Sequence, residues 1–206
     1  MVKKLSTLLL LASLFSESGD INFSVSGLVT GGNSGNRGDD VYTFSIDVPS
    51  QTPLDLTGLL FSEYGEGSSD NKYLEIYNGT DAEVDLTNLA FPNVANDPTT
   101  QGDYEYWNTF PEGAAVAVGD VYVIAHPDAD GIILDQADYT FQYLSNGNDG
   151  FCLVDGTEDS YAILDCIGDW NGNPGNGWDV AGISEATINH TLVRHSSIVE
   201  GNSGDW

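Results

Sequence analysis

The chain has very few basic residues. Its 206 residues include five lysines and arginines against 32 aspartates and glutamates, which gives a formal net charge of -27 at pH 7. A surface of this sign repels phosphate and offers almost no cations to displace the counterions of a nucleic acid. We therefore expect no nucleic acid among the partners. Two explanations of the acidity stay open: solubility in a salty medium, and the binding of cations, above all Ca²⁺.

Long hydrophobic runs are also missing. The leucine-rich stretch Leu5–Phe15 follows two lysines and is too short to cross a bilayer. It precedes the small residues Ser16 and Ser18, an arrangement typical of a secretory signal peptide. The sequence thus predicts a signal peptide over residues 1–18, a protein that is secreted or held at the cell surface, and no transmembrane span.

Cysteine is scarce as well. The chain has two, Cys152 and Cys166, in two apolar segments joined by a turn around Asp155–Thr157. In an exported protein such a pair is able to oxidise. Counting outward from the turn places Cys152 opposite Leu164, so a bridge requires a bulge or a slip in register. A disulfide and two buried free thiols both stay open.

Alternating apolar residues are the main structural signal. In Tyr73–Tyr77, Leu74 and Ile76 alternate with polar or aromatic residues, the period of a strand with one buried face. The dipeptide Asn78-Gly79 then predicts a tight turn with two positive φ angles. The same register places Glu63 near Glu75 on two adjacent strands.

Further short strands follow. We expect Val84–Leu86 to pair with Leu89–Phe91, a strand over Ala114–Val118, and a central strand at the apolar run Val121–Ala125. The one helical candidate is Ala129–Ala137. Residues 19–57 predict two more strands, Ile21–Thr30 and Val41–Val48, which form either an extra hairpin followed by a linker or a ribbon on the main domain.

From Leu59 onward the sequence resembles the lamin-tail domain of secreted bacterial proteins. The motifs that carry the resemblance occur in the family's order: Ser62–Tyr64, Leu74–Asn78, Asp85-Leu86, Gly119–Ala125, Leu144–Val154 and His190–Arg194. The resemblance implies an all-β, immunoglobulin-like antiparallel β-sandwich over residues 58–206, without a catalytic centre. It also implies a role as a binding module beside secreted or surface enzymes or in adhesion, as a monomer or as part of a larger chain. Arg194, at an arginine position of the family's last strand, is expected to pair with a carboxylate.

Two acidic loops are candidate calcium sites. One places oxygen side chains at alternate positions, as calcium loops do, but has proline where the EF-hand glycine belongs and lacks the closing glutamate. The other follows His126. The alternative for both is an ordinary polar turn. The candidate ligands are Asp169, Asn171 and Asn173 in the first loop and Asp128 and Asp130 in the second.

Clustered aromatic residues suggest a second kind of partner, a polysaccharide instead of a protein. Exposed coplanar rings stack on sugars, whereas the alternative is that long loops bury them. The candidates are Tyr104, Tyr106, Trp107, Trp170 and Trp178. A carbohydrate-binding module is therefore a rival interpretation, and whether its binding depends on calcium stays open.

A small secreted hydrolase is the third interpretation. Glu63, Glu66, Asp70 and Glu75 lie close in sequence, and paired carboxylates perform acid and base catalysis in glycosidases. Their spacing matches no catalytic motif, and the sequence has no nucleophile elbow or phosphate loop. We therefore expect no enzymatic activity, no catalytic residues and no cofactor apart from the candidate Ca²⁺.

Overall fold

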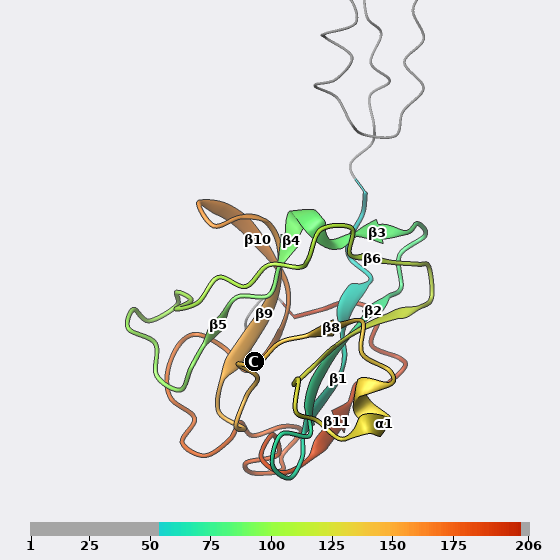
Figure 1. Ribbon diagram of the computed structural model, residues 1–206. Helices are drawn as coiled ribbons and strands as arrows, with labels where there is room; N and C mark the ends of the chain where they lie inside the picture. The colour runs from blue at the N-terminus through green and yellow to red at the C-terminus, as the bar shows by residue number, and fades with distance from the viewer. Residues whose placement is uncertain (1–53, 203–206) are drawn as a thin grey trace, which may run out of the picture. The chain divides into compact units, whose positions relative to one another are not determined.

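The computed structural model describes residues 54–202, which form an all-β fold (Figure 1). The expected all-β class is confirmed. The predictions for residues 1–53, including the signal peptide and the extra strands, lie outside the described residues. The strands are β1 (Leu59–Glu66), β2 (Lys72–Asn78), β3 (Val84–Asp85), β4 (Leu89–Ala90), β5 (Asn93–Val94), β6 (Ala115–Val116), β7 (Val121–Ala125), β8 (Tyr139–Thr140), β9 (Gly150–Thr157), β10 (Ser160–Ile167) and β11 (Thr191–Val193).

Helix is almost absent from this part of the chain. It contains the one-turn helix α1 (Gly131–Leu134), which falls inside the expected helical candidate, and the 3-10 turn η2 (Leu86–Asn88). Neither helix of residues 54–202 is long and apolar enough to cross a bilayer.

The largest sheet has the strand order β11-β1-β2-β7-β8, antiparallel except for the parallel pair β7 and β8. In β2 the side chains of Leu74 and Ile76 are buried, whereas Tyr73, Glu75 and Tyr77 are partly or largely exposed, so the predicted alternation is confirmed. Strand β7 lies between β2 and β8 and is almost entirely buried, which confirms the predicted central strand.

The second sheet consists of β10, β9 and β4, with β5 also paired to β9, and a separate ribbon joins β3 to β6. The expected pairing of Val84–Leu86 with Leu89–Phe91 is therefore wrong. The Asp85 side chain accepts hydrogen bonds from the backbone N–H of Thr87, at 2.8 Å, and from its hydroxyl, at 2.6 Å. This cap holds η2, and η2 takes the chain from the ribbon into the second sheet.

The two larger sheets share one apolar core. Phe61 of β1 and Ile76 of β2 belong to the same buried cluster as Phe151 and Leu153 of β9, and each of these side chains is at most 1% exposed. Burying one such side chain contributes roughly 1.5–3 kcal/mol. The shared core is the principal reason why the sheets stay together.

The turn after β2 differs from the prediction, because neither Asn78 nor Gly79 has a positive φ. Instead, the fully buried Asn78 side chain donates to the carbonyl oxygens of Ala82 and Val116 and accepts from Thr80. The small size of Gly79 serves a close approach, since a Cβ atom there would lie 3.0 Å from the Gly58 carbonyl oxygen. Asn78 and Gly79 are therefore needed for their packing contacts and not for a positive backbone φ angle.

A register shift in β10 brings the two cysteines together. The ladder between β9 and β10 is irregular between Ile163 and Asp165, so Cys166, and not Leu164, lies opposite Cys152. The two residues form a disulfide. Both are fully buried beside Trp170.

We predict that removal of this disulfide lowers the free energy of unfolding by about 3 kcal/mol, because the bridge closes a loop of roughly 15 residues in the unfolded chain. Urea unfolding of the full chain with and without reductant measures this loss. The double variant Cys152→Ala, Cys166→Ala is the control and should not respond to reductant. An identical midpoint for the oxidised and reduced wild-type protein would contradict the prediction.

Candidate functional site

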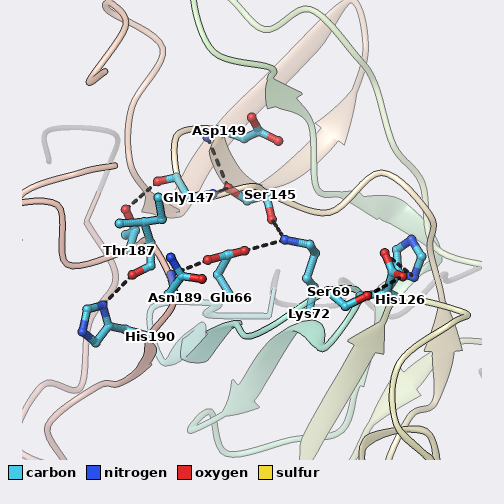
Figure 2. Close-up of polar contacts among 12 residues, drawn as sticks. Glu66, Ser69, Lys72, His126, Ser145, Gly147, Asp149, Thr187, Asn189 and His190 are labelled. Atoms are coloured by element: carbon cyan, nitrogen blue, oxygen red, sulfur yellow. Dashed lines mark hydrogen bonds and ion pairs between the residues drawn. The ribbon is translucent and has the colours of Figure 1, made fainter. Parts of the chain in front are cut away.

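A buried ion pair lies where β1 ends and β2 begins. The Lys72 ammonium nitrogen is 2.6 Å from the Glu66 Oε1 atom, and the two side chains are only 8% and 7% exposed. Lys72 also donates to the backbone carbonyl oxygen of Ser145 at 3.0 Å, as Figure 2 shows. A buried charge is tolerated only when it is paired and hydrogen-bonded, so this lysine fixes a loop to the sheet.

Two loops converge on this pair. The second carboxylate oxygen of Glu66 accepts a hydrogen bond from the Asn189 backbone N–H (Figure 2). The Ser145 hydroxyl oxygen accepts from the backbone N–H groups of Gly147, at 2.9 Å, and Asp149, at 3.3 Å. Thr187 donates from its hydroxyl to the Gly147 carbonyl oxygen. The cluster thus ties the segments around residues 145–149 and 187–189 to the end of the five-stranded sheet.

Asp149 is a buried acid whose pKa is strongly raised. Burial raises its pKa from the ordinary 3.8 to about 6, against the lowering effects of a backbone hydrogen bond from Asn96 and the charge of Lys72. The negative charge of Glu105 adds to the increase. Burial likewise raises the pKa of Tyr64, whose hydroxyl lies in the same region.

We predict that Asp149 makes the protein less stable as the pH rises. Because its folded pKa of about 6 exceeds the ordinary 3.8, the folded state binds more protons than the unfolded chain between these values. The contribution of Asp149 to the free energy of unfolding is therefore fully present below about pH 4. It falls by roughly 2–3 kcal/mol as the pH rises through about 6. Urea unfolding at both ends of this range, with wild type and Asp149→Asn, measures the change.

The variant is expected to match the wild type at about pH 4 and to be the more stable protein at about pH 7. Burial also raises the pKa values of Glu75 and Asp165, but both groups remain in the variant, so the difference between the two proteins isolates Asp149. Parallel stability profiles would show that the Asp149 carboxyl titrates normally.

Three of the acids considered for hydrolysis each have a hydrogen-bond partner of their own. Glu63 and Glu75 lie opposite each other in the ladder, as predicted, but Glu63 accepts from the Tyr73 hydroxyl at 2.9 Å and Glu75 from the Ser62 hydroxyl at 2.6 Å. Glu66 is held by Lys72 at the sheet end. These contacts give the three carboxylates separate structural roles.

The calcium candidates of the first acidic loop use their oxygens locally. Asp169 Oδ1 accepts from the Asn171 backbone N–H at 2.7 Å, and Asn173 Oδ1 accepts from the Gly175 backbone N–H at 2.8 Å. Such side-chain turns are the ordinary use of these residues in loops. In this conformation the Oδ1 atoms of Asp169 and Asn173 are thus each engaged by a backbone N–H of the same loop.

The second acidic loop brings a different set together. One ligand atom from each of Asp70, His126 and Asp128 lies within 4.8 Å of the others, whereas Asp130 is joined by two hydrogen bonds to Asn71. Asp70 precedes β2 and His126 follows β7, and these strands are antiparallel neighbours, so the two residues meet at one sheet end. A pairing of β2 with β7 deduced from the sequence would have indicated this group. Its imidazole and carboxylates suit a divalent cation.

The aromatic candidates form a packed cluster instead of a flat surface. Tyr104 lies 5.2 Å from Trp107 and 5.9 Å from Trp170, measured between ring centroids, with the ring planes inclined by 59° and 66°. Trp178 is buried elsewhere and donates from its indole to the Asp149 carbonyl oxygen, and Tyr106 is exposed. The rings therefore lack the coplanar exposed pair that stacking on a sugar requires.

A second buried carboxylate holds Arg194. Its guanidinium Nη2 lies 2.7 Å from Asp165 Oδ2, and its Nε–H donates to the Phe61 carbonyl oxygen. The expected pairing of Arg194 with a carboxylate is confirmed. Within residues 54–202 the lysines and arginines are Lys72 and Arg194 alone, and both charges are compensated by buried acids, so the outer surface is left strongly anionic.

An open hollow of about 400 Å³ lies beside β11. Most of its lining is apolar and comes from β1, β10, β11 and the segments around Val180 and Ile198; the lining includes Phe61, Tyr64, Ile167, Val180, Leu192 and Ile198. The hollow adjoins the exposed strand β11. No family model, curated protein or solved structure matches the chain.

Proposed function

We propose that this protein is an exported, noncatalytic interaction module of the lamin-tail type, which acts beside secreted or surface enzymes or in adhesion. Several motifs of the resemblance overlap strands: Leu74–Asn78 lies within β2, Gly119–Ala125 contains β7, and His190–Arg194 contains β11. Two largely antiparallel sheets around a shared core also suit an immunoglobulin-like sandwich.

The observation that carries the proposal is the use of the ionisable groups. The acids best placed for chemistry hold loops and strands: Glu66 binds Lys72, Asp165 binds Arg194, and Glu75 binds a neighbouring serine. The outer surface is anionic and has an apolar hollow beside the edge strand β11. Such a surface suits the recognition of a partner better than the turnover of a substrate.

Cross-linking in the cells that make the full chain tests this function. We expect one exported or surface protein to be cross-linked repeatedly. In parallel, chromogenic phosphodiester, glycoside and ester substrates should show no turnover above that of the matched variants Glu75→Gln and Asp149→Asn. Turnover by the wild-type protein that disappears in either variant would show that the protein is a hydrolase and would contradict the proposed function.

A divalent cation is a second candidate ligand, favoured by the group Asp70, His126 and Asp128. A thermal melt of the full chain with calcium, manganese or a chelator tests it, since a cation at about 100 times its dissociation constant adds ~2.7 kcal/mol of stability. We expect Asp70→Asn to abolish the increase and the exposed control Asp135→Asn to retain it. An unchanged melting temperature with every cation would remove this candidate.

A further inference from the structure

Strand β11 forms one edge of the five-stranded sheet, and its bonds to β1 define which way its backbone faces. The Glu66 N–H donates to the His190 carbonyl oxygen at 2.9 Å, and the Arg194 N–H donates to the Ser62 carbonyl oxygen at 2.8 Å. In an antiparallel ladder the bonded residues alternate with residues whose backbone groups face the other way. Positions 190, 192 and 194 therefore face β1.

The outer edge of β11 is consequently formed by Thr191 and Val193. Both residues are exposed, and no strand among residues 54–202 pairs with this side of β11. Each offers one backbone N–H donor and one carbonyl acceptor. An unpaired row of this kind is a ready template for another extended segment.

Apolar surface flanks this edge. The Val193 side chain is 66% exposed, Ile198 is about half exposed, and both line the hollow beside β11. In recognition by strand addition the backbone bonds supply affinity, and a pocket for alternate side chains supplies selectivity. The hollow of about 400 Å³ is large enough for one or two apolar side chains of a partner.

Charge decides between the candidate occupants of this edge. The chain carries a net charge of -27, and both cations of the described residues, Lys72 and Arg194, are held by buried carboxylates. A second copy has the same charge and is repelled, whereas a basic segment is attracted. An extended basic partner therefore fits this edge better than a copy of the chain.

We infer that the outer edge of β11 binds an extended, basic segment of a partner protein as an added strand, with an apolar side chain of that segment in the adjoining hollow. The inference rests on the proposed interaction function and names its surface. It assigns the backbone of Thr191 and Val193 to the added ladder and the exposed Val193 side chain to the apolar contact.

A peptide titration of the isotope-labelled full chain tests the inference. The probe is the capped peptide Lys-Gly-Lys-Val-Thr-Val-Lys-Gly-Lys, followed by amide NMR shifts at low salt. We expect the Thr191 and Val193 amides to shift together. A matched peptide that is N-methylated at its central residues keeps its charge but lacks ladder donors, and should bind about tenfold more weakly, because one or two hydrogen bonds are lost.

Two protein variants complete the test. Val193→Lys should weaken binding of the unmethylated peptide several-fold more than Val118→Lys, which adds the same charge at a valine that is 56% exposed and outside the hollow. The N-methylated peptide leaves the protein unchanged, so that comparison stands even where a variant misfolds.

Four results would overturn the inference. Equal binding of the two peptides, or shifts confined to other residues, would place the interaction elsewhere and leave the proposed interaction function intact. If neither peptide binds, β11 is not a strand acceptor. The cross-linking experiment would then decide the proposed function by itself. Concentration-dependent self-association that shifts the Thr191 and Val193 amides would show that a second copy occupies the edge.

Discussion

Replacement of Lys72 by methionine is expected to lower the free energy of unfolding by about 3–5 kcal/mol, since removal of one partner leaves the other charge buried and unpaired. Methionine fills a similar volume but cannot donate to Glu66 or to the Ser145 carbonyl oxygen. The Glu66 carboxylate would then retain only the Asn189 backbone N–H as a polar contact. Urea unfolding near neutral pH measures the loss.

A double variant separates loss of charge pairing from loss of packing. Glu66→Gln removes the unpaired charge and keeps an acceptor for the Asn189 N–H, so Lys72→Met with Glu66→Gln should recover much of the stability. Additive losses in the two single variants would mean that the side chains are not energetically coupled. In that case the pair does not hold the cluster at the end of the sheet.

Substitution of Asp165 by alanine is the second change with a large expected effect, also about 3–5 kcal/mol. The fully buried carboxylate accepts from the Phe61 backbone N–H at 2.7 Å, from the Arg194 guanidinium at 2.7 Å and from the Asn202 backbone N–H at 2.8 Å. It therefore joins β10 to β1 and to the chain after β11. Alanine would leave a buried N–H without an acceptor and a partly buried cation without its counter-ion.

Asp155→Ala provides the matched control, because Asp155 lies exposed on the neighbouring strand β9. An exposed substitution of this type is expected to change stability by no more than about 0.5 kcal/mol. Urea unfolding of both variants gives the comparison. Equal losses would contradict the structural role assigned to Asp165.

Local patterns in the sequence predicted the strands that alternate or are fully apolar. β2 and β7 were found in this way, because side-chain burial in a strand follows a short period. The same register that placed Glu63 opposite Glu75 also places Glu66 opposite Lys72. The pairing of Glu66 with Lys72 therefore follows from that register, whereas their burial depends on the loops that cover this end of the sheet.

Local sequence patterns do not predict contacts between segments that are far apart in the chain. The bulge that places Cys166 opposite Cys152 leaves no clear mark in the sequence, and the buried role of Asn78 depends on Val116, far along the chain. The meeting of Asp70 with His126 depends on the pairing of β2 with β7. Such positions follow from the packing of the whole fold, and single-segment propensities do not contain them.

Amide hydrogen exchange of the free full chain shows whether β11 has an open edge, which the proposed binding surface requires. We predict rapid exchange at the Thr191 and Val193 amides and slower exchange at the Leu192 and Arg194 amides, whose backbone groups face β1. Slow exchange at all four amides would show that the edge is already covered. It would contradict the assignment of β11 as the surface that receives a partner.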